Sequence, residues 1–264
     1  MSSYAVLLSN RRLIYARDIL SELVARDIKL RYKRSVMGIA WTLLNPLTEL
    51  LILLFIFKVV LPLDIPNYTS FLFIGILVFG WLQSSLVFAA NAIVANRDLV
   101  RQPNFPPTIL PVVTVTSNLI HFLLALPILF LFLLFNGIRP TIAILALPFV
   151  IALQFTFTLS LAYLVAALHV RFRDTQYLLK VILQFLFYLS PVFYSVGDVP
   201  ARFQTLYHLN PLVFLIDAYR AVLIRGEFPH PLSMLGLSLL SAALLYSGYA
   251  VFRRASYRFV EELG

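Results

Sequence analysis

Four ionisable residues lie within apolar stretches of this 264-residue sequence: Glu49, Lys58, Asp217 and Arg220. Charged side chains at membrane depth are costly and are functional candidates by default. Lys58 lies near the end of its stretch, where its long side chain can reach water. Glu49 lies mid-stretch and is predicted to face a helix interface or a wet pathway, which leaves a pore-lining role and a hydrogen-bonded structural role open. Asp217 and Arg220 are predicted to form a local ion pair.

Other patterns that would indicate chemistry are missing from the sequence. There is no GxxxxGKS/T phosphate-binding loop, so ATP binding of that kind is not expected. There is no cysteine, which rules out disulfides and thiolate metal sites. No paired carboxylates and no Ser/His/Asp arrangement can be argued, and we predict neither an enzyme nor a cofactor or metal site in this chain. The histidines have no ligand-like spacing and are interpreted as structural or interfacial: His121, His169, His208 and His230.

A dense group of aromatic side chains surrounds Pro191: Phe185, Phe187, Tyr188, Phe193 and Tyr194. Pro191 is expected to bend the segment that carries them. Aromatic faces offer flat apolar surfaces to sugar C–H groups while tyrosine hydroxyls form hydrogen bonds, which would suit a long glycan sliding past. For each single ring, a lipid-facing aromatic belt is an equal alternative.

The elements that position these residues are predicted to be membrane helices. Hydrophobic residues make up 61% of the sequence and charged residues only 12%, whereas a soluble domain has about 25% charged residues. The sequence therefore predicts one all-α integral membrane domain over residues 1–264, without a separate soluble domain. The net charge of +9 lies next to apolar spans, which favours membrane lipid headgroups over nucleic acid as its partner.

Six stretches reach the roughly 20 residues that cross a hydrocarbon core. They are residues 38–61, 69–94, 108–135, 141–168, 178–196 and 232–252. Residues 11–34 are predicted to form an amphipathic helix in the membrane interface, because apolar residues recur there at three- and four-residue steps between charges. Residues 200–225 contain Asn210-Pro211 and two charges, and they are predicted to form a re-entrant outer hairpin between the fifth and sixth spans rather than a seventh crossing.

The distribution of basic residues predicts the orientation. With six spans and both termini in the cytoplasm, 16 of the 21 Lys and Arg residues lie on the cytoplasmic side, in keeping with the positive-inside bias. They are Arg11, Arg12, Arg17, Arg26, Lys29, Arg31, Lys33, Arg34, Arg97, Arg101, Arg171, Arg173, Lys180, Arg253, Arg254 and Arg258. Residues 96–107, a short charged piece closed by prolines, then form a cytoplasmic loop.

Several short motifs occur in a characteristic order along nearly the whole chain. They are RDIKLRY at 26–32, SVMG at 35–38, Trp41 with Asn45-Pro46, NRDLVR at 96–101, RFRD at 171–174, QF at 184–185, YLSPVFY at 188–194 and LNP at 209–211. Together they resemble the permease subunits of ABC-2 type transporters, in the branch that exports O-antigens, capsular glycans and teichoic acids. Met37 stands where that family more often has Leu.

The resemblance implies partners and a location that composition does not. Such a subunit pairs as a homodimer around a pore and works with two copies of a separate nucleotide-binding ATPase, which binds ATP and Mg. The substrate would be a lipid-linked glycan, and the location the cytoplasmic (inner) membrane of a bacterium with both termini cytoplasmic.

The resemblance also implies roles for three groups of residues. The ATPase-coupling group is Arg26, Asp27, Arg31, Asn96, Arg97, Asp98, Leu99 and Arg101. The channel or substrate-path group is Trp41, Glu49, Phe185, Tyr188, Phe193 and Tyr194. The outer-gate group is Asn210, Pro211, Asp217 and Arg220.

Three alternatives stay open at this point. A proton-coupled secondary transporter would use Glu49, but such proteins usually contain inverted repeats, and no internal symmetry is visible here. An ABC-2 exporter of drugs or lipids differs mainly in its substrate, and many have a large extracellular domain or a fused ATPase, which this sequence lacks. A structural membrane scaffold would not need the charged loop or the re-entrant hairpin.

Overall fold

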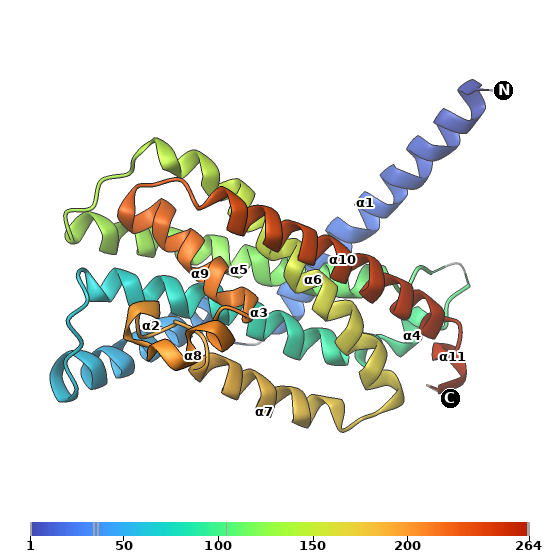
Figure 1. Cartoon of the computed structure of the whole chain (residues 1–264). Coiled ribbons are helices and arrows are strands. Elements are labelled where there is room, and N and C mark those ends of the chain that lie inside the picture. Colours follow the sequence, from blue (N-terminus) through green and yellow to red (C-terminus); the bar gives the residue numbers. More distant parts are fainter. Residues whose placement is uncertain (1, 34, 36, 104, 263–264) are drawn as a thin grey trace.

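The computed structural model describes residues 2–33, 35, 37–103 and 105–262 of the chain (Figure 1). Three residues in the predicted segments, Arg34, Val36 and Asn104, lie outside this range. Within it every regular element is a helix and none is a strand, which confirms the all-α class. The α-helices are α1 (Ser2–Tyr32), α2 (Trp41–Leu54), α3 (Tyr68–Ala95), α4 (Arg97–Val100), α5 (Ile109–Phe135), α6 (Leu147–Arg171), α7 (Thr175–Tyr188), α8 (Ala201–Tyr207), α9 (Pro211–Arg220), α10 (Pro231–Ser256) and α11 (Phe259–Glu262).

Five helical segments among the described residues are long and apolar enough to cross a membrane. They are Trp41–Val60, Tyr68–Ala95, Ile109–Phe135, Ile142–Arg171 and Pro231–Ser256. The first includes a π-helical continuation of α2 at Phe55–Val60, and the fourth begins with a 3-10 turn at Ile142–Ala146. Each begins and ends within a few residues of one of the apolar stretches found in the sequence, because charges, prolines and glycines bound those stretches.

The remaining predicted span, residues 178–196, has a different structure. α7 contains 14 residues, so it is about 21 Å long, shorter than the roughly 30 Å hydrocarbon core. The helix ends at Tyr188, just before Ser190-Pro191, because proline cannot donate a helical hydrogen bond and disfavours helical geometry in the residue before it. A non-helical turn, residues 189–195, follows and leads to α8.

α3 is the central helix of the bundle. It packs against α2, α5, α6, α7 and α9. In its most apolar stretch of 18 residues, 67% of the residues are buried, compared with 6% in the corresponding stretch of Trp41–Val60. Side chains that it buries almost completely include Leu72, Phe73, Ile74, Phe79, Leu82 and Ile93. α2 therefore lies at the edge of the bundle and leaves much of its apolar surface uncovered.

A close helix crossing fixes α10 against α6. A Cβ atom at Gly248 would lie 2.6 Å from the carbonyl oxygen of Ser160, so a larger residue would force the two helices apart. Next to this crossing, the rings of Tyr163 and Phe252 meet edge to face with centroids 5.2 Å apart. Phe252 also packs on Phe259 of α11, and both of these phenylalanines are fully buried.

Different elements meet at the two ends of the helix bundle. Figure 1 shows α4, α11 and the last turns of α6 and α10 together at one end, called here the α4 end. α11 contacts α4, α6 and α10 there. The connection between α2 and α3 lies at the opposite end (Figure 1). The two short helices α8 and α9 follow the turn after α7, and α9 packs against α3, α6 and α10.

Candidate functional site

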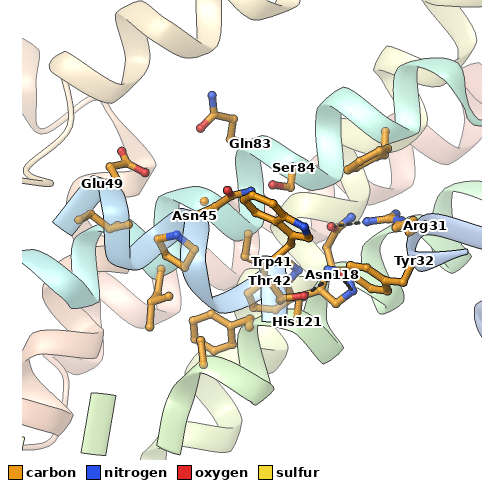
Figure 2. A pocket seen from close by; sticks show the side chains of 18 residues that line it. Arg31, Tyr32, Trp41, Thr42, Asn45, Glu49, Gln83, Ser84, Asn118 and His121 are labelled. Atoms are coloured by element: carbon orange, nitrogen blue, oxygen red, sulfur yellow. Dashed lines mark hydrogen bonds between the residues drawn. The ribbon is translucent and has the colours of Figure 1, made fainter. Parts of the chain in front are cut away.

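A cavity of about 550 Å³ opens between the end of α1 and helices α2, α3 and α5 (Figure 2). Trp41 and Glu49, both predicted to lie on a substrate path, contribute to its wall from α2. Figure 2 shows the Trp41 indole in the middle of the group, with Glu49 further along α2. The other labelled residues of the wall are Arg31, Tyr32, Thr42, Asn45, Gln83, Ser84, Asn118 and His121. The cavity thus combines an aromatic ring with both donors and acceptors of hydrogen bonds.

Arg31 joins the end of α1 to two other helices. Its Nη1 donates a hydrogen bond to Asn118 Oδ1 of α5 at 3.0 Å, and its Nη2 lies 2.9 Å from Asp27 Oδ2, one turn earlier on α1. The guanidinium carbon also lies 3.9 Å from the ring centroid of Phe88 on α3, in a cation–π contact. Only 14% of the Arg31 side chain is exposed, so this charge holds α1, α3 and α5 together.

Tyr32, the last residue of α1, makes a second connection. Its hydroxyl forms hydrogen bonds with Thr42 Oγ1 of α2 at 2.5 Å and with His121 Nε2 of α5 at 3.2 Å. The structural interpretation of His121 agrees with this contact. Together, Arg31 and Tyr32 fasten the end of α1 to α2, α3 and α5.

Glu49 lines the cavity without a local partner. Its carboxylate makes no ion pair or hydrogen bond with any described residue, and its side chain is exposed. The sequence left two roles open for Glu49, lining a pore and forming structural hydrogen bonds. Among the described residues, none forms the hydrogen bond that the second role requires. Lys58 is also exposed, as its position near the end of the span predicted.

Three of the predicted ATPase-coupling residues share a groove at the α4 end. Arg26 and Asp27 from α1 and Asn96 from the end of α3 line a pocket of about 240 Å³ between α1, α3 and α5. Asn96 itself is held in place because its Nδ2 donates to the carbonyl of Ala92 at 2.9 Å. Arg31 belongs to the other cavity, although the prediction grouped it with these residues.

The predicted loop at 96–107 contains the short helix α4. Arg97 and Asp98 project from it, with 62% and 91% of their side chains exposed and 3.7 Å between Arg97 Nε and Asp98 Oδ1. Arg101 is exposed and Leu99 is half-buried, while Val100 is buried. α4 also contacts α3 and α11, so it presents a charged face while its apolar face is fixed to the bundle.

The turn after α7 is supported by side chains rather than by regular backbone hydrogen bonds. Three of its carbonyl groups, and that of Tyr188 at the end of α7, each accept a hydrogen bond: Tyr188 from the Tyr194 hydroxyl (3.0 Å), Leu189 from Asn210 Nδ2 (3.3 Å), Val192 from Arg220 Nη2 (2.9 Å) and Phe193 from the Tyr68 hydroxyl (2.8 Å). Asn210 also caps α9, because its Oδ1 accepts from the amide of Leu212. The donors come from α3, α9 and the turn itself.

The same turn crosses α3 at Gly75. A Cβ atom at that position would lie 2.5 Å from the Val192 carbonyl oxygen and 2.9 Å from its Cα, so only glycine allows the two backbones to approach this closely. The turn is therefore pressed directly onto the central helix.

The predicted ion pair between Asp217 and Arg220 is wrong. Asp217 pairs with Arg225, with Arg225 Nη1 at 2.9 Å from Asp217 Oδ1, because the π-helical segment Ala221–Arg225 brings Arg225 to the side of Asp217. Arg220 points inward and is only 4% exposed. It donates to the carbonyls of Phe71 (3.1 Å) and Val192 (2.9 Å), and its guanidinium carbon lies 3.3 Å from the Phe71 ring centroid.

Three of the five predicted path aromatics meet around this turn. The ring of Phe193 lies 6.2 Å from that of Tyr188 and 5.0 Å from that of Tyr194, and it stacks on Phe57 at 5.0 Å. Phe185 is 65% exposed on α7 and takes no part in these pairs. Tyr194, with Asn210 and Pro211, also lines an apolar hollow of about 760 Å³ next to α8.

Several residues of these sites were not singled out from the sequence. Phe57, Tyr68 and Asn118 connect elements that lie far apart in the chain, and Arg225 replaces Arg220 as the partner of Asp217. Their residue types are common in membrane helices, so no signal in a single sequence marks them.

The family profile described as ABC-2 type transporter matches residues 20–224 of this sequence, which include the polar cavity, α4 and the turn after α7. The chain belongs to the ABC-2 type transporter family. It is similar to the O-antigen export system permease protein RfbA of Myxococcus xanthus, with 35% identity over 256 residues that cover 96% of this chain and 98% of that protein. An RfbA of Klebsiella pneumoniae is 31% identical over 94% of this chain and 96% of its own length. The polysialic acid transport protein KpsM of Escherichia coli is 24% identical over 88% and 91%.

Membership in this family agrees with the chemistry of the chain. A permease subunit of this kind is a multi-pass membrane protein and is not itself catalytic, since nucleotide binding belongs to an ATPase partner. Among the described residues, no group of histidine, aspartate and glutamate side chains could hold a metal ion.

Proposed function

We propose that this ABC-2 permease subunit moves a lipid-linked, O-antigen-like polysaccharide across the cytoplasmic membrane, powered by a separate ATPase subunit. The observation that carries this proposal is the similarity, over nearly the full length of both chains, to a protein named as an O-antigen export permease. The aromatic group around Phe193 supports it, because rings bind the apolar faces of successive sugars without demanding one sequence of sugars.

The proposal includes six crossings with both termini in the cytoplasm. α7 and the turn after it would form the fifth crossing, and α8 and α9 would form a re-entrant outer gate containing Asn210, Pro211, Asp217 and Arg220. In support, non-helical backbone at membrane depth requires partners for its polar groups, and three carbonyls of this turn have side-chain donors. α1 would lie in the membrane interface as it approaches Arg31.

The proposed working unit is a homodimer around one channel. Both α2 and α7 leave apolar side chains uncovered, and a second copy of the chain would bury them. These side chains include Leu51, Ile52, Phe55, Val181, Ile182 and Phe185. Trp41, Glu49, Phe185, Tyr188, Phe193 and Tyr194 would then lie along or near the path between the two copies.

The proposed coupling runs from the ATPase to the cavity. Two copies of the ATPase would contact the groove at Arg26, Asp27 and Asn96 and the exposed residues Arg97 and Asp98 of α4. Movement of α1 would then reach α2, α3 and α5 through the contacts of Arg31 and Tyr32. In this scheme ATP turnover opens the path that the substrate follows.

The test is purification of the chain from native membranes, followed by ATPase assays with and without a lipid-linked glycan. We expect a separate ATPase subunit to copurify and its turnover to respond to the glycan. Recovery with an ATPase that responds to a drug or an unmodified lipid instead would make this an ABC-2 exporter of another substrate. A chain that purifies alone and shows proton-dependent flux would contradict the proposal and indicate secondary transport through Glu49.

A further inference from the structure

Another polar pocket lies at the α4 end and shares no residue with the cavity at Trp41. It has a volume of about 290 Å³ and lies between the last turns of α6 and α10 and the short helix α11 (Figure 1). Its lining consists of three arginines, one glutamate and two alanines: Arg171, Arg254, Arg258, Glu262, Ala167 and Ala255. The small alanine side chains leave the space that the guanidinium groups surround.

The positive charge of this pocket is not balanced by the chain. In the part of the chain that the structure describes, none of the three arginines has a carboxylate within 4.0 Å. Like charges in one pocket repel each other unless an anion binds between them. The helix macrodipole accounts for a cation in the last turn of a helix, such as Arg171 on α6 and Arg254 on α10, but not for Arg258, which lies beyond α10. All three arginines are exposed, so an anion could reach the pocket from the surface of the protein.

The position of the pocket indicates the kind of anion. α6 and α10 belong to two of the candidate membrane spans, and the pocket lies where both of them end. Tyr257, in the turn after α10, is 76% exposed, as expected of a tyrosine at the level of lipid headgroups. Arginine is well suited to phosphate because its planar guanidinium group donates two parallel hydrogen bonds.

We propose that this pocket binds the phosphate group of an anionic phospholipid in the cytoplasmic leaflet. The assignment to that leaflet rests on the orientation given under the proposed function, whereas the site itself does not depend on which glycan is exported. A bound phosphate would join the ends of α6 and α10 to α11. Because α11 contacts α4, the lipid would also steady the helix proposed to meet the ATPase.

The test uses the full chain with its ATPase partner in bilayer discs of phosphatidylcholine that contain a minor fraction of phosphatidylglycerol. Native mass spectrometry then counts the phosphatidylglycerol molecules that stay bound to each permease. Since each basic residue near a membrane surface contributes roughly fivefold to anionic lipid binding, the triple variant Arg171→Gln/Arg254→Gln/Arg258→Gln should weaken retention by about a hundredfold. Arg253→Gln, the control on the same helix turn but outside the pocket, should weaken retention by about fivefold at most.

Two further measurements exclude misfolding and a different source of phosphate. Glu262→Gln removes the one carboxylate of the pocket and should tighten retention by about fivefold, a gain that a damaged fold cannot produce. Millimolar inorganic phosphate should leave the bound lipid in place, because it lacks the attached acyl chains. Equal retention by the triple variant and Arg253→Gln, no lipid on the wild-type chain, or full displacement by inorganic phosphate would each overturn the proposal. The readout needs no glycan, so its failure is separate from failure of the export assay.

Discussion

At the scale of single residues, Arg220 is a charged side chain that connects α9 to α3 and to the turn after α7. Arg220 is buried, and its Nη2 donates to two carbonyl oxygens while the guanidinium group lies over an aromatic ring. Its buried Nε has no hydrogen-bond partner among the described residues. The carbonyl group of Val192 lies in a turn without regular backbone hydrogen bonds, so Arg220 is the donor that satisfies it. Arg220 is therefore a positioning residue for the turn after α7.

Replacing Arg220 tests this role. Arg220→Met should lower the free energy of unfolding by about 1–3 kcal/mol, because it leaves the buried carbonyl of Val192 without its donor. Arg225→Met is the matched control, since it removes a half-exposed ion pair with Asp217 whose loss should cost about 1 kcal/mol or less. Thermal unfolding of both variants in the same detergent gives the comparison. Equal melting temperatures would show that Arg220 does not hold the turn.

Glu49 lines the polar cavity, so its access to water tests whether this face of α2 borders a water-filled pathway or a dry helix interface. Because the native sequence has no cysteine, Glu49→Cys creates a single thiol without any background. We expect a charged, membrane-impermeant thiol reagent to modify it in the assembled transporter, because the residue lines the polar cavity. Ile74→Cys on α3, whose side chain is only 1% exposed, should stay unmodified. Protection of both thiols would place Glu49 in a dry interface.

At the scale of elements, α4 combines a fixed apolar side with an exposed charged side. This division favours a docking role, since its charges can be removed without disturbing the packing of Val100. The expected effect of changing them is therefore on coupling and not on folding.

The double variant Arg97→Ala/Asp98→Ala tests that role. It should change the free energy of unfolding by no more than about 0.5 kcal/mol, as is usual for exposed residues. Export should fall at least tenfold while the partner continues to hydrolyse ATP, because hydrolysis would no longer move the permease. The measurements are glycan transport and ATPase turnover in the same vesicles. Normal export by this variant would refute the coupling assignment.

The sequence predicts the elements of this fold better than their contacts. Apolar runs bounded by charges and prolines locate five long helices within a few residues, since burial in lipid requires that pattern. The three-residue spacing of Asp217 and Arg220 suggests an ion pair, but it does not show that Arg220 points inward. The π-helical segment Ala221–Arg225 changes the rotation per residue and places Arg225 next to Asp217. The hydrogen bond from Tyr68 to Phe193 joins residues 125 positions apart, a separation at which one sequence carries no contact information.

At the scale of the whole molecule, the proposed homodimer would cover the exposed apolar face of α2 with a second copy of the chain. Leu51→Cys, at a site 66% exposed, should form an intermolecular disulfide under mild oxidation if two copies pack through α2. Leu239→Cys on α10, 64% exposed, is the matched control and should remain monomeric on a non-reducing gel. Crosslinking of the control alone would move the dimer interface away from α2.

α3 connects the two regions on which the proposed transport cycle depends. Its end leads directly into α4 through Asn96, and near its beginning it carries Gly75 under the Val192 backbone and Phe71 under Arg220. With 28 residues it is about 42 Å long, and neighbouring helices surround most of it. A push on α4 would therefore reach the turn after α7 as a shift of the whole of α3, which would move the Val192 backbone together with Gly75.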